Sequence, residues 1–139
     1  ALKKIPRISH VSAHMGCTQI ADEVKTLAKK LAKEYKIDID LEAYGVKWMR
    51  YEGPKETAAD KIQSFINALK MLEPGQAYVF VDHPGIDDAE LRAIYHIGYE
   101  QVAADRQGVT DLFTDEYVRT FIQQNGIQLI GYKDLLKHK

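Results

Sequence analysis

Apolar residues follow two different spacings along this chain, and the two spacings alternate. Four short segments have the apolar character or the period-two alternation of buried strands. They are Ile8–Ala13, Ile37–Leu41, Tyr78–Val81 and Ile127–Ile130. Because helical patterns separate them, we expect right-handed crossovers and an α/β fold, with a mainly parallel sheet and flanking helices.

The segments between these strands repeat their apolar residues every three or four positions, as amphipathic helices do. The predicted helices are Ile20–Tyr35 with Thr18 as its N-cap, Ile62–Leu72 after Pro54, a helix from Asp87 with Glu90 at capping-box spacing, Tyr117–Ile122 with Thr114 as its N-cap, and Lys133–His138. Asn125-Gly126 is typical of a helix C-terminus. With no repeat or linker, residues 1–139 are expected to form a single domain.

Composition narrows the class of protein. The chain has 139 residues, of which 45% are hydrophobic and 28% charged, as in ordinary globular domains. The formal net charge of -1 marks no surface for nucleic acid or an anionic membrane. No apolar run approaches the length of a membrane span, and no signal peptide is recognisable, so we expect a cytoplasmic protein.

Two histidines stand where predicted strands end, which is where α/β enzymes keep their chemistry. His83 follows the apolar run Tyr78–Val81, and His14 ends the segment that contains His10 and Ser12. A strand-end histidine is most often a hydrogen-bonded structural residue. Residues four apart on a strand lie about 13 Å apart, so His10 and His14 cannot both bind one metal ion. We favour His14 as the ligand and His10 as a buried supporting residue.

Other polar and aromatic residues have simpler interpretations. His96 and His138 fit exposed helix positions, and the single cysteine, Cys17, fits a small buried thiol. Arg106 follows Asp105 and is interpreted first as a member of a surface ion pair. Trp48 lies in an irregular segment, where an aromatic side chain can serve in the core or in a lid.

The spaced motifs resemble those of the YdjC-like carbohydrate deacetylase family, in particular its carboxyl-terminal half. The resemblance covers essentially the whole chain. It is carried by Ser9-His10-Val11-Ser12-Ala13-His14, by the strand that ends in His83-Pro84-Gly85, by the Arg106 segment, and by the closing stretch from Asn125 to Leu135. It implies part of a (β/α)-barrel of the glycoside hydrolase/deacetylase type, here incomplete, and the removal of acetyl groups from N-acetylated sugars or oligosaccharides.

The resemblance also implies roles for individual residues. His14 matches a metal ligand and His83 a catalytic histidine, while His10, Ser12, Arg106 and Trp48 are the supporting or substrate residues. The implied cofactor is a divalent metal ion, Mg or Zn. Ser12 stands where many members have Asp, and the family's upstream Asp-Asp pair and second metal-binding histidine have no counterpart. We therefore expect a fragment with an incomplete metal site, inactive alone, that self-associates as a homo-oligomer or pairs with a missing amino-terminal half.

Two alternatives remain open at this point. One is a non-catalytic carbohydrate-binding or interaction module, and the other is a different metal-dependent hydrolase such as a phosphoesterase. Fold alone does not separate them from the deacetylase. Arg or Lys clustered around the site would favour phosphate chemistry.

Overall fold

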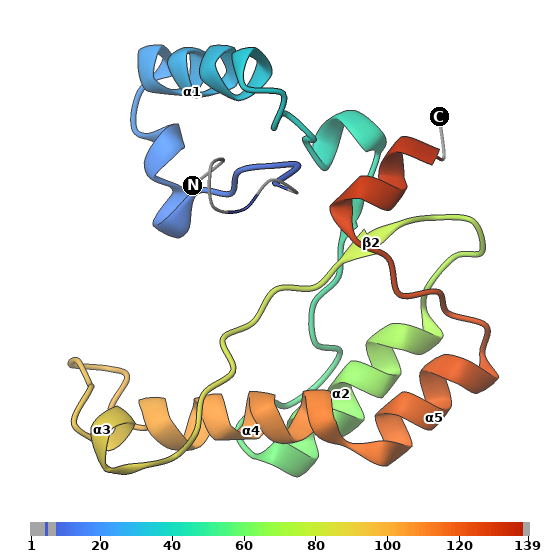
Figure 1. Cartoon of the computed structure of the whole chain (residues 1–139). Coiled ribbons are helices and arrows are strands. Elements are labelled where there is room, and N and C mark those ends of the chain that lie inside the picture. Colours follow the sequence, from blue (N-terminus) through green and yellow to red (C-terminus); the bar gives the residue numbers. More distant parts are fainter. Residues whose placement is uncertain (1–4, 6–7, 138–139) are drawn as a thin grey trace. The chain divides into compact units, whose positions relative to one another are not determined.

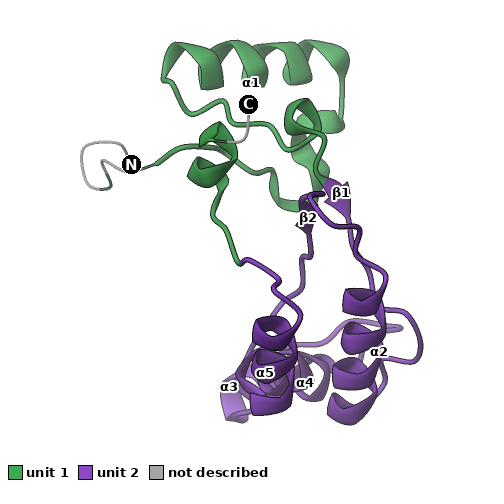
Figure 2. Cartoon of the chain, turned by 90° about the vertical axis from the view of Figure 1, so that its right-hand side faces the viewer, with its two compact units in different colours: residues 1–46, 129–139 green, residues 47–128 purple. Residues whose placement is uncertain are grey.

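The computed structural model describes residue 5 and residues 8–137 of the chain (Figure 1). The chain divides into two compact units, shown in different colours in Figure 2. Unit 1 comprises Ala1–Val46 and Leu129–Lys139, and unit 2 comprises Lys47–Gln128. The expectation of a single domain stays a prediction.

Unit 2 is built around three helices: α2 (Ala58–Lys70), α4 (Val102–Thr114) and α5 (Glu116–Gln124). The apolar stripe predicted for α2 is its buried face, since Phe65, Ile66 and Leu69 pack with Leu112 of α4 and Val118 of α5. Thr57 caps α2 in a capping box with Asp60. These helices support the polar residues of the candidate site.

The sheet of unit 2 has two short parallel strands, β1 (Lys47–Trp48) and β2 (Tyr78–Val79). Lys47 lies opposite Tyr78, and Trp48 opposite Val79. The Tyr78–Val81 prediction is therefore confirmed in its first half. Beyond the strands, Met49, Tyr51 and Phe80 pack against the hydrophobic core. This packing fixes the course of the two segments that follow β1 and β2.

The predicted incomplete (β/α)-barrel of the glycoside hydrolase/deacetylase type is wrong. Across residues 5 and 8–137 the fold is rich in helix, with only the β1–β2 sheet. The segments 8–13, 37–41 and 127–130 form no strand. Ile37 N–H donates to Ala32 and Ile127 N–H to Ile122, so both complete the ends of preceding helices. Hydrophobic alternation without a neighbouring strand does not make a ladder.

Unit 1 contains helix α1 (Asp22–Glu34) and three 3-10 helices, η1 (His14–Gln19), η2 (Glu42–Tyr44) and η3 (Tyr132–Lys137). The predicted Ile20–Tyr35 helix is confirmed as α1, but its N-cap is Ala21 rather than Thr18. The predicted final helix is the 3-10 helix η3, and His138 lies outside the described residues. Ala32 and Leu135 are the buried residues in the described part of this unit.

Two N-caps in the structure lie one residue after the predicted ones. Asp88, not Asp87, caps α3 (Ala89–Arg92), and Asp115, not Thr114, caps α5. Thr114 is the last residue of α4, where its hydroxyl donates to the carbonyl of Thr110 at 2.9 Å. Gly126 adopts a φ of 65°, as the predicted helix end requires. None of the helices in the described ranges is both long and apolar enough to cross a bilayer.

Candidate functional site

The apolar run Tyr78–Val81 delivers Asp82 and His83 to the surface of unit 2. Asp82 Oδ1 accepts a hydrogen bond from the backbone N–H of His83 at 2.8 Å. The same oxygen lies 3.9 Å from Nδ1 of the His83 ring. The imidazole is 65% exposed and the carboxylate only 19%. His83 is thus open to a ligand, while its carboxylate neighbour is held from within the fold.

Tyr51 is the residue that holds Asp82. Its hydroxyl donates to Asp82 Oδ2 at 2.7 Å. Tyr51 lies four residues after Lys47, and Asp82 lies four residues after Tyr78, the strand partner of Lys47. Burial, followed by the hydrogen bond to Asp82, raises the pKa of Tyr51 far above its usual range. The phenol therefore stays protonated and remains a donor to the carboxylate.

Lys61 is a buried lysine close to the Tyr51–Asp82 pair. Its side chain is only 3% exposed, and Nζ lies 2.7 Å from Asp105 Oδ1. Nζ is also 5.5 Å from the centroid of the Tyr51 ring. Tyr99 donates its hydroxyl to the other oxygen of Asp105. Burial opposes ionisation of Asp105, but the hydrogen bonds from Lys61 and Tyr99 outweigh it and lower the pKa of the carboxyl.

The His83-Pro84-Gly85 turn is fastened to α4 by Arg106 and Thr110. Gly85 N–H donates to the carbonyl of Arg106 at 3.1 Å, and the Thr110 hydroxyl donates to the carbonyl of Gly85 at 2.7 Å. A Cβ on Gly85 would lie 3.1 Å from Cβ of Arg106 and 2.8 Å from Leu91 Cδ2. Glycine is therefore required for this close approach.

Arg106 does not pair with its neighbour Asp105, whose carboxylate is occupied by Lys61 and Tyr99. Nε of Arg106 is buried and has no hydrogen-bond partner among the described residues. This atom is enclosed by protein, so it offers no contact for a ligand. The contribution of Arg106 to the candidate site is its packing against Gly85.

The sequence-predicted residues near His14 lie in unit 1. His10 stacks on Tyr132 with ring centroids 3.5 Å apart, and its Nδ1 lies 3.1 Å from the Ser9 hydroxyl. Ser12 is exposed, as is His14, the first residue of η1. His10 is thus half-buried against an aromatic ring, as a supporting role requires. Because His14 belongs to unit 1 and His83 to unit 2, neither unit by itself contains the expected pair.

We tested whether the described residues fit a resident metal ion. They contain no group of three or more His, Cys, Asp or Glu side chains that could hold one. A catalytic zinc site uses three such ligands. The donor set in residues 5 and 8–137 therefore does not by itself form a site for the implied ion.

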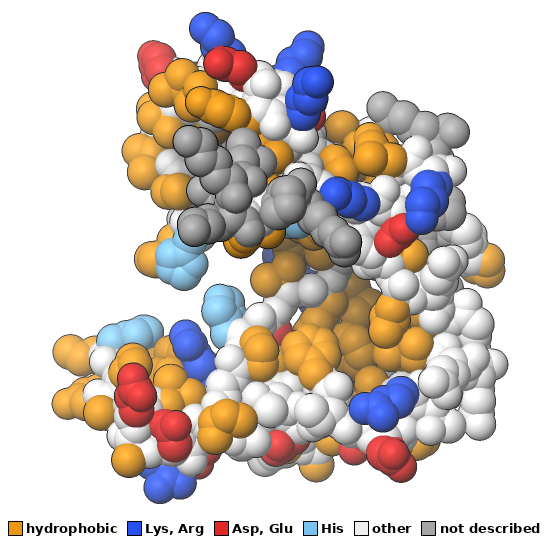
Figure 3. All heavy atoms as spheres, in the orientation of Figure 1, with side chains coloured by type: hydrophobic (Ala, Val, Ile, Leu, Met, Phe, Trp, Pro, Cys, Tyr) orange, Lys and Arg blue, Asp and Glu red, His pale blue; other side chains and the backbone are white. Residues whose placement is uncertain are grey.

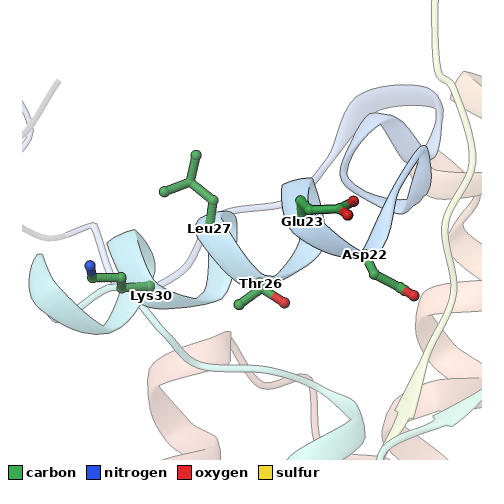
Figure 4. Close-up of a pocket in the computed structure, with 5 residues that line it drawn as sticks. All are labelled: Asp22, Glu23, Thr26, Leu27 and Lys30. Carbon is green, nitrogen blue, oxygen red and sulfur yellow. The ribbon is translucent and has the colours of Figure 1, made fainter.

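Two hollows lie on the surface of the described residues, one in unit 2 and one in unit 1. One, of about 190 Å³, is bordered by Trp48, Arg50, Glu52, Met71 and Tyr78 in unit 2, and the indole of Trp48 is 66% exposed. The other runs along α1 and is lined by Asp22, Glu23, Thr26, Leu27 and Lys30 (Figure 4). All five of these come from one helix, so no second wall encloses a ligand there. The Trp48 hollow has the mixture of aromatic and polar groups that ligand sites use.

Sequence reasoning identified His83 but missed the residues that hold its neighbourhood, namely Tyr51, Lys61, Tyr99 and Thr110. Basic and acidic side chains are interspersed on the face seen in Figure 3, in line with the nearly neutral charge. Comparison of the chain with family models, with curated proteins and with solved structures finds no match.

Proposed function

We propose that this chain is part of a YdjC-like, metal-dependent carbohydrate deacetylase in which His83 is the general acid. The observation that carries the proposal is the exposed His83 imidazole beside an Asp82 carboxylate held by Tyr51. An amine is a poor leaving group unless it is protonated, and a positioned imidazolium supplies that proton. Asp82 Oδ1 lies 3.9 Å from Nδ1 of this imidazole.

The proposed reaction is hydrolysis of the amide of an N-acetylated sugar. Water adds to the acetyl carbonyl, the C–N bond breaks, and His83 transfers its proton to the departing nitrogen. The products are acetate and the free amino sugar. His14 stays the residue expected to bind a divalent ion, as the resemblance implies, and a base for the attacking water is not assigned to any described residue.

The test measures acetate release from N-acetylated oligosaccharides together with metal content, in the protein that carries this chain. We expect His83→Ala to leave the metal content unchanged and to lower turnover by about 10²- to 10⁴-fold, the usual effect of losing a proton donor. His14→Ala is expected to lose metal and turnover together. His96→Ala, another exposed histidine of unit 2, is the matched control and should retain full activity.

Three outcomes would contradict this proposal. Turnover that persists in both His14→Ala and His83→Ala would show that neither residue takes part. Wild-type turnover that is unaffected by complete removal of metal would remove the metal-dependent mechanism. Loss of activity in His96→Ala to the same extent as in His83→Ala would reduce the effect to general damage.

A second candidate, a carbohydrate-binding module without catalysis, is favoured by Trp48. An aromatic ring exposed beside polar groups can stack on a pyranose and hydrogen-bond its hydroxyls. Trp48 is the only tryptophan of the chain, so intrinsic fluorescence reports on it alone. Saturable fluorescence changes with chitooligosaccharides, without acetate release, would favour this module. No change at all would remove Trp48 from the list of substrate residues.

A further inference from the structure

The Lys61 side chain is almost fully buried, which is rare for a lysine. It lies on the buried face of α2, with its ammonium between the Asp105 carboxylate and the ring of Tyr51. Burying a charge costs several kcal/mol before any partner compensates it, so such a lysine demands an explanation. Its partner Asp105 is itself bonded by Tyr99, so the cation is tied into a network rather than to a single residue.

The neighbouring helix accommodates this side chain. Gly108 of α4 faces Lys61, and a Cβ at Gly108 would lie 3.2 Å from Cε and 3.3 Å from Cδ of the lysine. It would also lie 3.4 Å from Cα of Ala58. The absence of a side chain at position 108 therefore makes the space through which the lysine reaches Asp105 and the Tyr51 ring.

Tyr51 connects this buried cation to the exposed pair. A cation near an aromatic ring is attracted to its π-system and restrains where the ring lies. The Tyr51 hydroxyl in turn donates to Asp82, whose other oxygen accepts from the His83 backbone. Lys61, Tyr51, Asp82 and His83 thus form a continuous series of contacts from the core of unit 2 to its surface.

We propose that Lys61 is a positioning residue for the Asp82–His83 pair, acting through the ring and hydroxyl of Tyr51. Held in place, the phenol stabilises the Asp82 carboxylate through its hydrogen bond, and that carboxylate lies beside the His83 ring. The other charged or titratable groups that act on this network are Asp105 and Arg106 of α4, Tyr99 ahead of α4, and Lys55 ahead of α2. The role of this network in catalysis rests on the proposed function, whereas the effect of Lys61 on the Asp82–His83 pair does not.

The experiment follows the titration of the His83 ring by NMR, which needs neither substrate nor turnover. The chain has five histidines, and the resonance missing from His83→Gln assigns the signal. Tyr51→Phe removes the donor to Asp82, so the measured titration of the His83 ring should move to higher pH than in wild type. The double variant Lys61→Met/Asp105→Asn removes the cation without leaving an unpaired charge, and should move the titration in the same direction but less.

Two further variants make the result specific. Lys47→Met removes a lysine of the same unit whose ammonium lies 2.7 Å from Glu73 but is exposed, and it should leave the titration of His83 unchanged. Gly108→Ala keeps the charge of Lys61 but intrudes on its stem, and should move the titration as the double variant does. This variant decides the question should the double variant not fold.

The proposal is overturned if Tyr51→Phe shifts the titration while the folded Lys61→Met/Asp105→Asn and Gly108→Ala variants do not, since Lys61 would then be a packing residue only. It is equally overturned if Tyr51→Phe leaves His83 unchanged. Absence of acetate release by the protein would contradict the proposed function without altering these titrations, so failures of the two proposals are distinguishable.

Discussion

Lys61 and Asp105 are an unusually well-matched pair of residues, and the energy of such a pair depends on which partner is removed. Breaking a buried ion pair leaves one charge without compensation, whereas replacing both partners by neutral groups is often tolerated. Lys61 is 3% exposed and Asp105 33%, so the lysine bears most of the desolvation cost.

We therefore predict that Lys61→Met alone lowers the free energy of unfolding by about 3 kcal/mol, the lower end of the range for a broken buried pair. The lower end is expected because Asp105 retains some contact with water. Lys61→Met/Asp105→Asn should recover most of this loss. Urea denaturation monitored by circular dichroism gives both values, and a double variant as unstable as the single one would contradict the prediction.

The second prediction concerns the pH dependence of stability, and it follows from the lowered pKa of Asp105. A carboxyl whose pKa is lower in the folded state stabilises the protein above its unfolded pKa, near 3.9, and loses this contribution as pH falls through the folded value. The stability difference between wild type and Lys61→Met/Asp105→Asn should thus be constant from about pH 7 to 5 and change, to the disadvantage of wild type, below about pH 4.

The exposed pair Lys47–Glu73 provides the control for this measurement. Its charged atoms lie 2.7 Å apart, as in the buried pair, but its side chains are 49% and 66% exposed. Because water and salt screen exposed pairs, Lys47→Met/Glu73→Gln should differ little from wild type at any pH. An equal acid response from both pairs would mean that burial of Lys61 is not the cause.

Sequence reasoning reached His83 because an apolar run that ends in a polar residue is a local signal. It did not reach Tyr51, which bonds to a carboxylate 31 residues away, or Lys61, whose partner is 44 residues away. Neighbouring side chains on a strand face opposite sides, so the sequence pattern alone predicts no coupling between Asp82 and His83. The structure couples them through the backbone N–H of His83 instead. A lysine within the apolar stripe of α2 was the available signal for a buried pair.

At the scale of elements, the beginning of α2 shows how local chemistry fixes a helix. Thr57 Oγ1 accepts from Asp60 N–H at 3.1 Å, while Asp60 Oδ2 accepts from Thr57 N–H at 3.1 Å. Two of the unpaired donors at the helix end are satisfied in this way. The carboxylate also lies in the first turn, where the helix dipole favours negative charge.

We predict that Thr57→Ala lowers the free energy of unfolding by about 1 kcal/mol, the typical value of an N-cap side chain. Thr26→Ala is the matched control, since Thr26 is an exposed residue inside α1 and alanine favours a helix interior. The measurement is again urea denaturation. A loss in Thr26→Ala as large as that in Thr57→Ala would contradict the capping argument.

Helices could be predicted from this sequence and strands largely could not, for a physical reason. The apolar stripes of α1 and α2 are complete within each segment, and a helix satisfies its own backbone groups. A strand needs a neighbour that its own sequence does not specify. Residues 37–41 alternate as a strand would, yet Ile37 completes the end of α1 and Ile39 makes a single long bond to Ser9, at 3.4 Å. The expectation of a larger, mainly parallel sheet rested on these segments, and it is wrong because they form no strands.

For the whole molecule, the distribution of buried residues matters more than the number of elements. The hydrophobic core joins α2, α4 and α5 of unit 2, with Ile66, Val109 and Leu112 fully enclosed. In the described part of unit 1, only Ala32 and Leu135 are buried. Free energies of local opening follow the burial of apolar contacts. The two units should therefore differ widely in local stability.

The last prediction is that native-state hydrogen exchange separates the two units. Amides in the middle of α2 and α4 should exchange most slowly, with opening free energies near the global value, and those of α1 should exchange faster although α1 has the same length as α2, 13 residues. Leu112→Ala, which leaves a cavity in the core, should accelerate exchange in α2, α4 and α5 by an amount equal to its loss of about 2–5 kcal/mol in global stability. Equal protection of α1 and α2 would show that both helices share one cooperative core.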